Sequence, residues 1–102
     1  MGLFSRKKKV VKEIDGPIWG YLVNMHKIDV DTLSKSLRYV EREEVGREQK
    51  SRILLRVFRW TEAQQRGIAV EGWETLDQHP ELILFEGYQN QDDEVHLEPK
   101  NV

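Results

Sequence analysis

The segment from Arg52 to Trp60 most constrains the fold, because its side chains alternate between two chemically different sets. One set is aliphatic and consists of Ile53, Leu55 and Val57. The other set mixes basic, apolar and aromatic side chains, namely Arg52, Leu54, Arg56, Phe58 and Trp60. A period of two is typical of a β-strand, in which successive side chains point to opposite faces of a sheet. The segment therefore predicts a sheet with one apolar face and one mixed face.

Two helices are predicted ahead of this strand. Asp15 is suited to cap a first helix over about residues 16 to 26, because Pro17 falls in the first turn, where its missing N–H costs nothing. Asp31 is a second cap candidate, and the apolar spacing after it predicts a helix from Thr32 to about Arg42. Residues 37–44 equally fit a strand that turns through Val45-Gly46-Arg47 and forms a hairpin with the segment near Ser51.

The second half of the chain alternates short helices and strands. Thr61-Glu62-Ala63-Gln64 matches a capping box, and Gly67 is placed to end that helix in a left-handed conformation. Thr75-Leu76-Asp77-Gln78 is a weaker box, which must stop before Pro80 because the residue preceding a proline is biased toward extended geometry. Residues 82–89 and 94–98 then form a hairpin around a polar turn.

These elements predict an α+β fold in a single domain, because 102 residues suffice for one core. We expect a small, mainly antiparallel sheet, with strands at about 51–60, 82–89 and 94–98 and with 37–44 as the undecided segment. One or two N-terminal helices cover it, the first from Pro17 to His26. Residues 1–14 are expected to be a basic, disordered arm, residues 15–98 the domain and residues 99–102 a C-terminal tail.

Composition narrows the function classes. The chain has no cysteine, which excludes disulfides, a thiol nucleophile and cysteine-containing zinc sites. Charged residues make up 33% of the chain, which is typical of a well-solvated surface. No apolar run approaches the roughly 18 residues of a membrane span. A soluble, cytoplasmic protein is the expectation.

The charges of the chain are concentrated at its ends. The arm up to Lys12 holds five basic residues and no acid, whereas residues 86–102 hold five acids and one lysine. Such blocks usually belong to solvated, interacting termini. The arm could also bind an anionic membrane surface, since its apolar tip precedes a row of cations. That candidate site consists of Leu3, Phe4, Arg6, Lys7, Lys8, Lys9 and Lys12.

No catalytic or metal-binding constellation stands out. Asp77, His79 and Glu81 alternate around Pro80, and His96 on the last predicted strand could approach them, but this spacing matches no established ligand motif. None of the serines lies in a nucleophile elbow. We therefore expect a protein without enzymatic activity, cofactor or metal.

The mixed face of the Arg52 strand is the best candidate binding surface. Basic groups interleaved with aromatic rings suit phosphate contact and base stacking, and the candidate residues are Lys50, Arg52, Arg56, Phe58 and Trp60. An ordinary solvated sheet would instead pair these arginines with Glu86, Glu94 and Glu98 on neighbouring strands. If Phe58 and Trp60 are exposed, the face is a binding surface; if they are buried under a helix, they belong to the core.

The sequence thus favours a small, non-enzymatic binding or adaptor domain that meets a macromolecular partner, expected to be a protein, through this face or the arm. Nucleic-acid binding is the first alternative, and association with an anionic membrane through the arm is the second.

Overall fold

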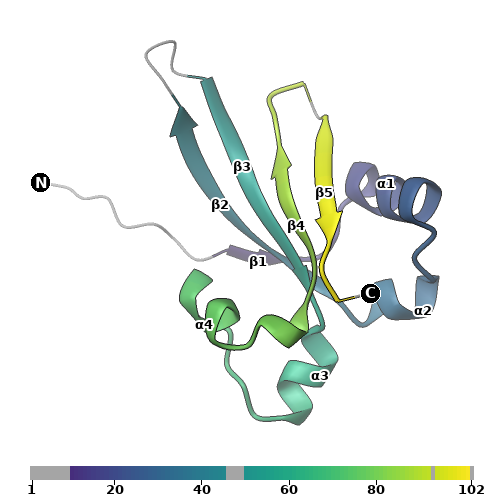
Figure 1. Cartoon of the computed structure of the whole chain (residues 1–102), viewed down its shortest axis with the longest axis vertical. Helices are drawn as coiled ribbons and strands as arrows, with labels where there is room; N and C mark the ends of the chain where they lie inside the picture. The colour runs from purple at the N-terminus through teal and green to yellow at the C-terminus, as the bar shows by residue number, and fades with distance from the viewer. Residues whose placement is uncertain (1–9, 46–49, 93, 102) are drawn as a thin grey trace, which may run out of the picture.

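Five antiparallel strands lie side by side in the order in which they occur in the chain (Figure 1). The structure is a computed structural model that describes residues 10–45, 50–92 and 94–101; for residues 10, 42–45, 50 and 51 it describes the backbone alone. The strands are β1 (Val10–Lys12), β2 (Leu37–Val45), β3 (Lys50–Phe58), β4 (Ile83–Gln89) and β5 (Val95–Pro99). The predicted α+β class with an antiparallel sheet is confirmed.

Helix α1 (Gly16–His26) confirms the first predicted helix. The Asp15 carboxylate accepts a hydrogen bond from the Ile18 backbone N–H at 3.0 Å, which satisfies one of the donors left open at a helix start. Lys27 ends the helix in the left-handed conformation, with φ of 58°. Ile18 and Leu22 are completely buried, so α1 is held by its packing against the sheet.

Residues 37–45 form a strand, so the hairpin alternative is confirmed and the helix from Thr32 to Arg42 is wrong. Helix α2 (Val30–Ser34) is short and is capped by Asp29 instead of Asp31. The chain then becomes extended and pairs with β3 from Leu37 opposite Phe58 to Val45 opposite Lys50. This pairing buries Val40 on one face of the sheet and Tyr39 on the other. The removal of both apolar side chains from water favours the strand over the helix.

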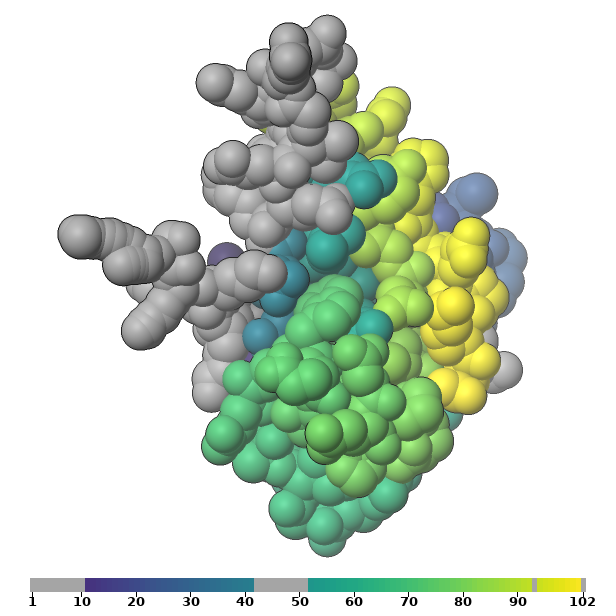
Figure 2. All heavy atoms as spheres, turned by 60° about the vertical axis from the view of Figure 1, so that its left-hand side comes forward, coloured from purple at the N-terminus to yellow at the C-terminus, as the bar shows by residue number. Residues whose placement is uncertain are grey.

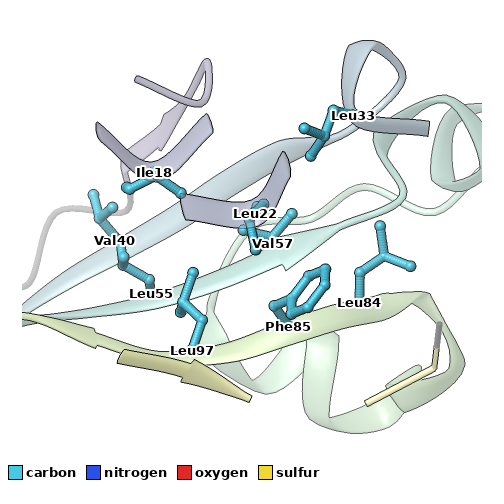
Figure 3. Packing of buried hydrophobic residues seen from close by; sticks show 9 residues of the cluster. All are labelled: Ile18, Leu22, Leu33, Val40, Leu55, Val57, Leu84, Phe85 and Leu97. Atoms are coloured by element: carbon cyan, nitrogen blue, oxygen red, sulfur yellow. The ribbon is translucent and has the colours of Figure 1, made fainter. Parts of the chain in front are cut away.

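One face of the sheet is covered by α1 and α2. Their buried side chains Ile18, Leu22 and Leu33 pack on aliphatic and aromatic residues of four strands (Figure 3). The strand residues of this cluster are Val40, Leu55, Val57, Leu84, Phe85 and Leu97. The aliphatic set of the Arg52 strand therefore faces these helices, as its period predicts.

The opposite face carries α3 (Trp60–Gln65), α4 (Trp73–Gln78) and a 3₁₀ turn, η1 (Pro80–Leu82). The two helices were expected from capping boxes, but they begin at Trp60 and Trp73, and neither has a side-chain cap. Packing sets these starts, because both indoles contact the buried cluster beneath them. The left-handed conformation expected of Gly67 is confirmed by its φ of 72°.

Strand β1 lies within the segment assigned to the disordered arm. Val10–Lys12 pairs with Tyr39 and its neighbours on β2, and Val11 packs against the cluster around Phe58. The positive charges of this segment favoured a disordered arm, although its two β-branched residues, Val10 and Val11, are suited to a strand. At the other end of the chain, the side-chain amide of Asn101 donates to the carbonyls of Pro80 and Ile83, at 2.7 and 2.8 Å.

No helix in the described part of the chain is long and apolar enough to cross a membrane.

Candidate functional site

The mixed face of β3 is divided between a covered half and an open half. Helices α3 and α4 lie over the end that contains Phe58, and in Figure 2 they project from the lower part of the molecule as a green layer. The register between β3 and β4 shifts at this point, because Val57 pairs with Phe85 and Phe58 with Ile83, which leaves Leu84 of β4 as the extra residue. The open half begins beyond Arg56.

The aromatic residues of the candidate surface lie in the covered half. Phe58 is completely buried. Trp60 is partly buried, and its ring meets that of Phe58 edge-on at 6.2 Å between centroids. Trp73 packs in the same manner on Tyr39, at 5.4 Å, and burial raises the pKa of the Tyr39 hydroxyl. Phe58 is therefore core, and a base has no route to its ring in this fold.

Arg56 is held by the protein itself. Its Nε donates to Glu86 at 2.6 Å, one terminal nitrogen donates to Asp77 at 2.8 Å, and the other donates to the Trp73 carbonyl at 3.0 Å. The guanidinium also lies 4.1 Å from the centre of the Trp73 ring. Only 7% of the residue is exposed. The expected cross-strand pair with Glu86 is present, and Arg56 additionally anchors α4 to the sheet.

Among the described side chains of the open half, four form a group that we call the Tyr88 row: Arg52, Leu54, Tyr88 and His96. Tyr88 on β4 stands opposite Leu54 on β3 and His96 on β5. The Arg52 guanidinium lies 4.8 Å from the centre of the Tyr88 ring, and the His96 ring lies 5.0 Å from it on the β5 side. His96 is exposed and the other three are partly exposed. The row thus offers stacked flat groups and an aliphatic side chain to solvent.

The charges around the Tyr88 row are of both signs. Glu98 lies on the same face of β5 as His96 and is exposed. Glu86 pairs with Arg56 and stands 3.6 Å from the Lys100 ammonium. Glu94, which was expected to pair with an arginine, accepts instead from the Asn90 side chain at 2.8 Å. This mixture differs from the uniformly positive surface that phosphate binding requires.

Of the residues considered for a metal site, His79 and Glu81 approach each other to 3.6 Å, while the others are engaged elsewhere. Asp77 binds Arg56, His96 stacks on Tyr88, and Glu81 accepts from Arg66 at 2.9 Å. The pKa of the Glu81 carboxyl is lowered by its own backbone N–H and then by Arg66. Within the described ranges, no three His, Cys, Asp or Glu side chains come together as potential metal ligands.

The remaining candidates are only partly described. Lys50 pairs with Val45 at the start of β3, and its side chain lies outside the description. Lys12 is exposed on β1, opposite Arg38. Leu3, Phe4, Arg6, Lys7, Lys8 and Lys9 lie outside the described residues. Of the five residues proposed for the binding face, the structure leaves Arg52 partly exposed and places it beside Leu54, Tyr88 and His96, none of which was proposed for that face.

Tyr88 was not singled out from the sequence because it lies in no recognisable motif, and His96 was considered only as a possible metal ligand. Their signal was the strand pattern, since Glu86, Tyr88, His96 and Glu98 share the face of Arg52 once the hairpin register is known.

No protein-family model matches the chain, and the searches of curated proteins and of solved structures also gave no match. The functional argument therefore depends on the geometry of the chain itself.

Proposed function

We propose that this chain is a non-enzymatic protein-binding domain, whose contact surface is the Tyr88 row on the open half of the sheet. The observation that carries the proposal is the incomplete cover of that face. Helices α3 and α4 bury the half around Phe58, while Arg52, Leu54, Tyr88 and His96 remain partly or fully exposed.

The composition of the row supports a protein partner. Tyrosine and arginine are the side chains enriched among residues that dominate binding energy at protein interfaces, because they combine a large apolar surface with polar groups. Tyr88 is held between Arg52 and His96, which restricts its rotation before a partner arrives. A ring that is already ordered loses less entropy on binding.

The step between the two halves also supports the proposal. The helices of the covered half rise from the sheet beside the open half (Figure 2). A partner that lies on the Tyr88 row can therefore also contact the side of α4. The two surfaces together form a concave contact area that is larger than the row alone.

Nucleic-acid binding is less well supported by the same residues. Arg56 is committed to Glu86 and Asp77, and Phe58 is buried, so the face lacks its central cation and one of its two expected stacking rings. Glu98 adds negative charge beside His96. We expect a single-stranded oligonucleotide to bind more weakly than about 10⁻⁶ M at physiological salt, within the range of non-specific association.

The test compares two alanine variants with the unchanged chain. Tyr88→Ala removes the centre of the row, while Met25→Ala removes an apolar side chain that is 69% exposed on α1 and serves as the matched control. Proteins captured from the source cells by each chain are identified, purified and titrated calorimetrically. A genuine partner should bind Tyr88→Ala at least about tenfold more weakly, as is typical when a central aromatic contact is removed, and should bind Met25→Ala normally.

Equal affinity of a purified partner for all three chains would contradict the proposed surface. Oligonucleotide binding tighter than about 10⁻⁶ M, weakened by Trp60→Ala, would favour the nucleic-acid alternative.

A further inference from the structure

The outer edge of β5 presents backbone groups that a further strand would pair with. Strand β5 is the last strand of the sheet, and among the described residues no strand lies on its outer side (Figure 1). The Lys100 N–H donates to the Leu84 carbonyl at 2.8 Å, so the backbone of Lys100 faces β4. Because this direction alternates along an antiparallel strand, the backbone groups of Val95, Leu97 and Pro99 point away from β4.

The central position of this edge is occupied by a tyrosine from α1. The Tyr21 hydroxyl lies 3.3 Å from both the nitrogen and the carbonyl oxygen of Leu97, accepting from the first and donating to the second. Both bonds are longer than usual, since N–H···O bonds extend to about 3.2 Å and O–H···O bonds to about 3.0 Å. His26 supports the tyrosine, with 3.4 Å between its Nε2 and the hydroxyl. We call this contact the Tyr21 latch.

The side chains around Leu97 are self-complementary. If two copies of β5 run antiparallel with Leu97 opposite Leu97, each residue before it meets the residue equally far after it. The resulting pairs are Glu94 with Lys100, His96 with Glu98 and Val95 with Pro99. Directly opposed side chains lie on the same face of a sheet. Charged and polar groups therefore meet on the mixed face, and apolar groups meet on the other face.

The pairs on the mixed face are attractive. All four side chains that form them are exposed in the single chain. Unlike charges that stand directly opposite each other stabilise an antiparallel pair, as Glu94 and Lys100 would. The His96 imidazole can donate a hydrogen bond to the Glu98 carboxylate of a second copy. Within one copy, Glu98 stands opposite Glu86, a like charge, so this new neighbour would offset an existing repulsion.

We propose that the outer edge of β5 is a self-pairing edge, at which two copies of this chain join antiparallel around Leu97 once the Tyr21 latch of each copy opens. The long bonds to the hydroxyl are then exchanged for bonds between the two Leu97 backbones. Both mixed faces lie on the same side of the joined sheet, so the two Tyr88 rows share one surface. A strand of another protein would meet the same backbone groups, but the symmetric charge pattern favours a second copy.

Analytical ultracentrifugation of the full-length chain tests the latch. Tyr21→Ala removes the hydroxyl and the ring, and it should raise the dimer association constant at least about tenfold, because no latch has to open in either copy. His26→Ala removes the support of Tyr21 and should act in the same direction to a smaller extent. Trp19→Ala is the matched control, because Trp19 is another partly buried aromatic residue of α1 that packs against the same cluster.

Charge reversals in the Tyr21→Ala background test the register. Glu94→Lys places two lysines opposite each other and Lys100→Glu places two glutamates opposite each other, so each variant alone should lose most of the dimer. An equimolar mixture restores unlike pairs and should form a heterodimer at least about fivefold more strongly than either variant pairs with itself. Glu71→Lys, at an exposed position before α4, controls for the change in net charge.

Three results would overturn the proposal. The first is an association constant that Tyr21→Ala and His26→Ala leave at the value of the unchanged chain. The second is an equal rise in Trp19→Ala, which would attribute association to a loss of stability. The third is a mixture of Glu94→Lys and Lys100→Glu that associates no better than either variant alone, because the pairing around Leu97 requires that gain.

Discussion

At the scale of single residues, Arg56 does most to join the two layers of the mixed face. It carries an ion pair to β4, an ion pair to α4 and a stacking contact with Trp73. Its near-complete burial makes these contacts structural, because a buried guanidinium must be paired to offset its loss of hydration.

Removing Arg56 should therefore be costly. We expect Arg56→Met to lower the free energy of unfolding by about 3 kcal/mol, since Glu86, Asp77 and the Trp73 carbonyl all lose the donor that they share. Asp77→Asn should cost below about 1 kcal/mol, because the Asp77 side chain is 55% exposed. Urea unfolding measures both changes. Equal losses in the two variants would contradict the assigned roles.

Gly87 has a different role, which is to permit a close approach of strands. A Cβ atom at this position would lie 1.8 Å from the His96 carbonyl oxygen, so β5 could not keep its place beside β4. We expect Gly87→Ala to destabilise the fold by about 3 kcal/mol or more. Gly20→Ala, inside α1 with no atom nearer than 3.9 Å, should instead stabilise it by about 0.5–1 kcal/mol.

Thermal unfolding of the two alanine variants distinguishes these effects. A Gly87→Ala protein as stable as the unchanged chain would show that the two strands do not approach so closely.

Asp29 makes the start of α2 sensitive to pH. Its carboxylate accepts from the Thr32 N–H at 2.7 Å and from the Thr32 hydroxyl at 2.9 Å, and these bonds lower its pKa, the backbone bond most. A lowered folded-state pKa means that the cap's contribution is present above the unfolded value of about 3.9 and is lost as pH falls through the lowered one.

The carboxyl carbon shift of Asp29 should thus titrate below about 3.9, and the Thr32 amide should move with the same midpoint. In Asp29→Asn the Thr32 amide should no longer move with that midpoint. A midpoint at or above the ordinary value would contradict the cap.

Sequence reasoning was most accurate for residues with local roles. Asp15 and Gly67 were identified because a cap and a left-handed glycine depend on neighbours three or four positions away. Arg56 was assigned only in part: its pair with Glu86 was expected, but its second partner Asp77 is 21 positions distant and was considered for metal binding instead. Tyr88 was missed because its place in the candidate site depends on contacts with Arg52 and His96, and these residues become its neighbours only when the sheet forms.

At the scale of elements, the ambiguous segment after α2 illustrates why local pattern was insufficient. Leu37 and Val40 fit both a helical stripe and a strand, and pairing with β3 decides between the two. Strand β1 was overlooked for a related reason. Its three residues are too few to show a strand pattern, and they are extended because they pair with β2. Strand β3, in contrast, is long and its side chains alternate strongly, so it was predicted without knowledge of its partners.

The contact between α1 and β5 offers a test at this scale. Tyr21→Phe keeps the ring but removes the hydroxyl that bridges both backbone groups of Leu97. We expect a loss of about 1 kcal/mol in the free energy of unfolding, together with faster exchange of the Leu97 amide. Exchange of the Lys100 amide, which bonds to Leu84 within the ladder, is the control. An unchanged exchange rate of the Leu97 amide would mean that the Tyr21 hydroxyl does not protect the outer edge of β5.

At the scale of the whole molecule, helices pack on both faces of the sheet, and on the mixed face they cover only the half around Phe58. Helices α1 and α2 complete the first layer, whereas α3 and α4 stop beside Arg56 and leave the Tyr88 row open. A fold that buries Phe58 but exposes Tyr88 retains a surface with the chemistry of a protein interface.

The most direct test of this account is to map the contact of the labelled chain with a purified partner by NMR cross-saturation. The account predicts that signal loss centres on Leu54, Tyr88 and His96 and leaves the buried Phe58 unaffected. Signal loss confined to α1 and α2, with the Tyr88 row unchanged, would contradict it.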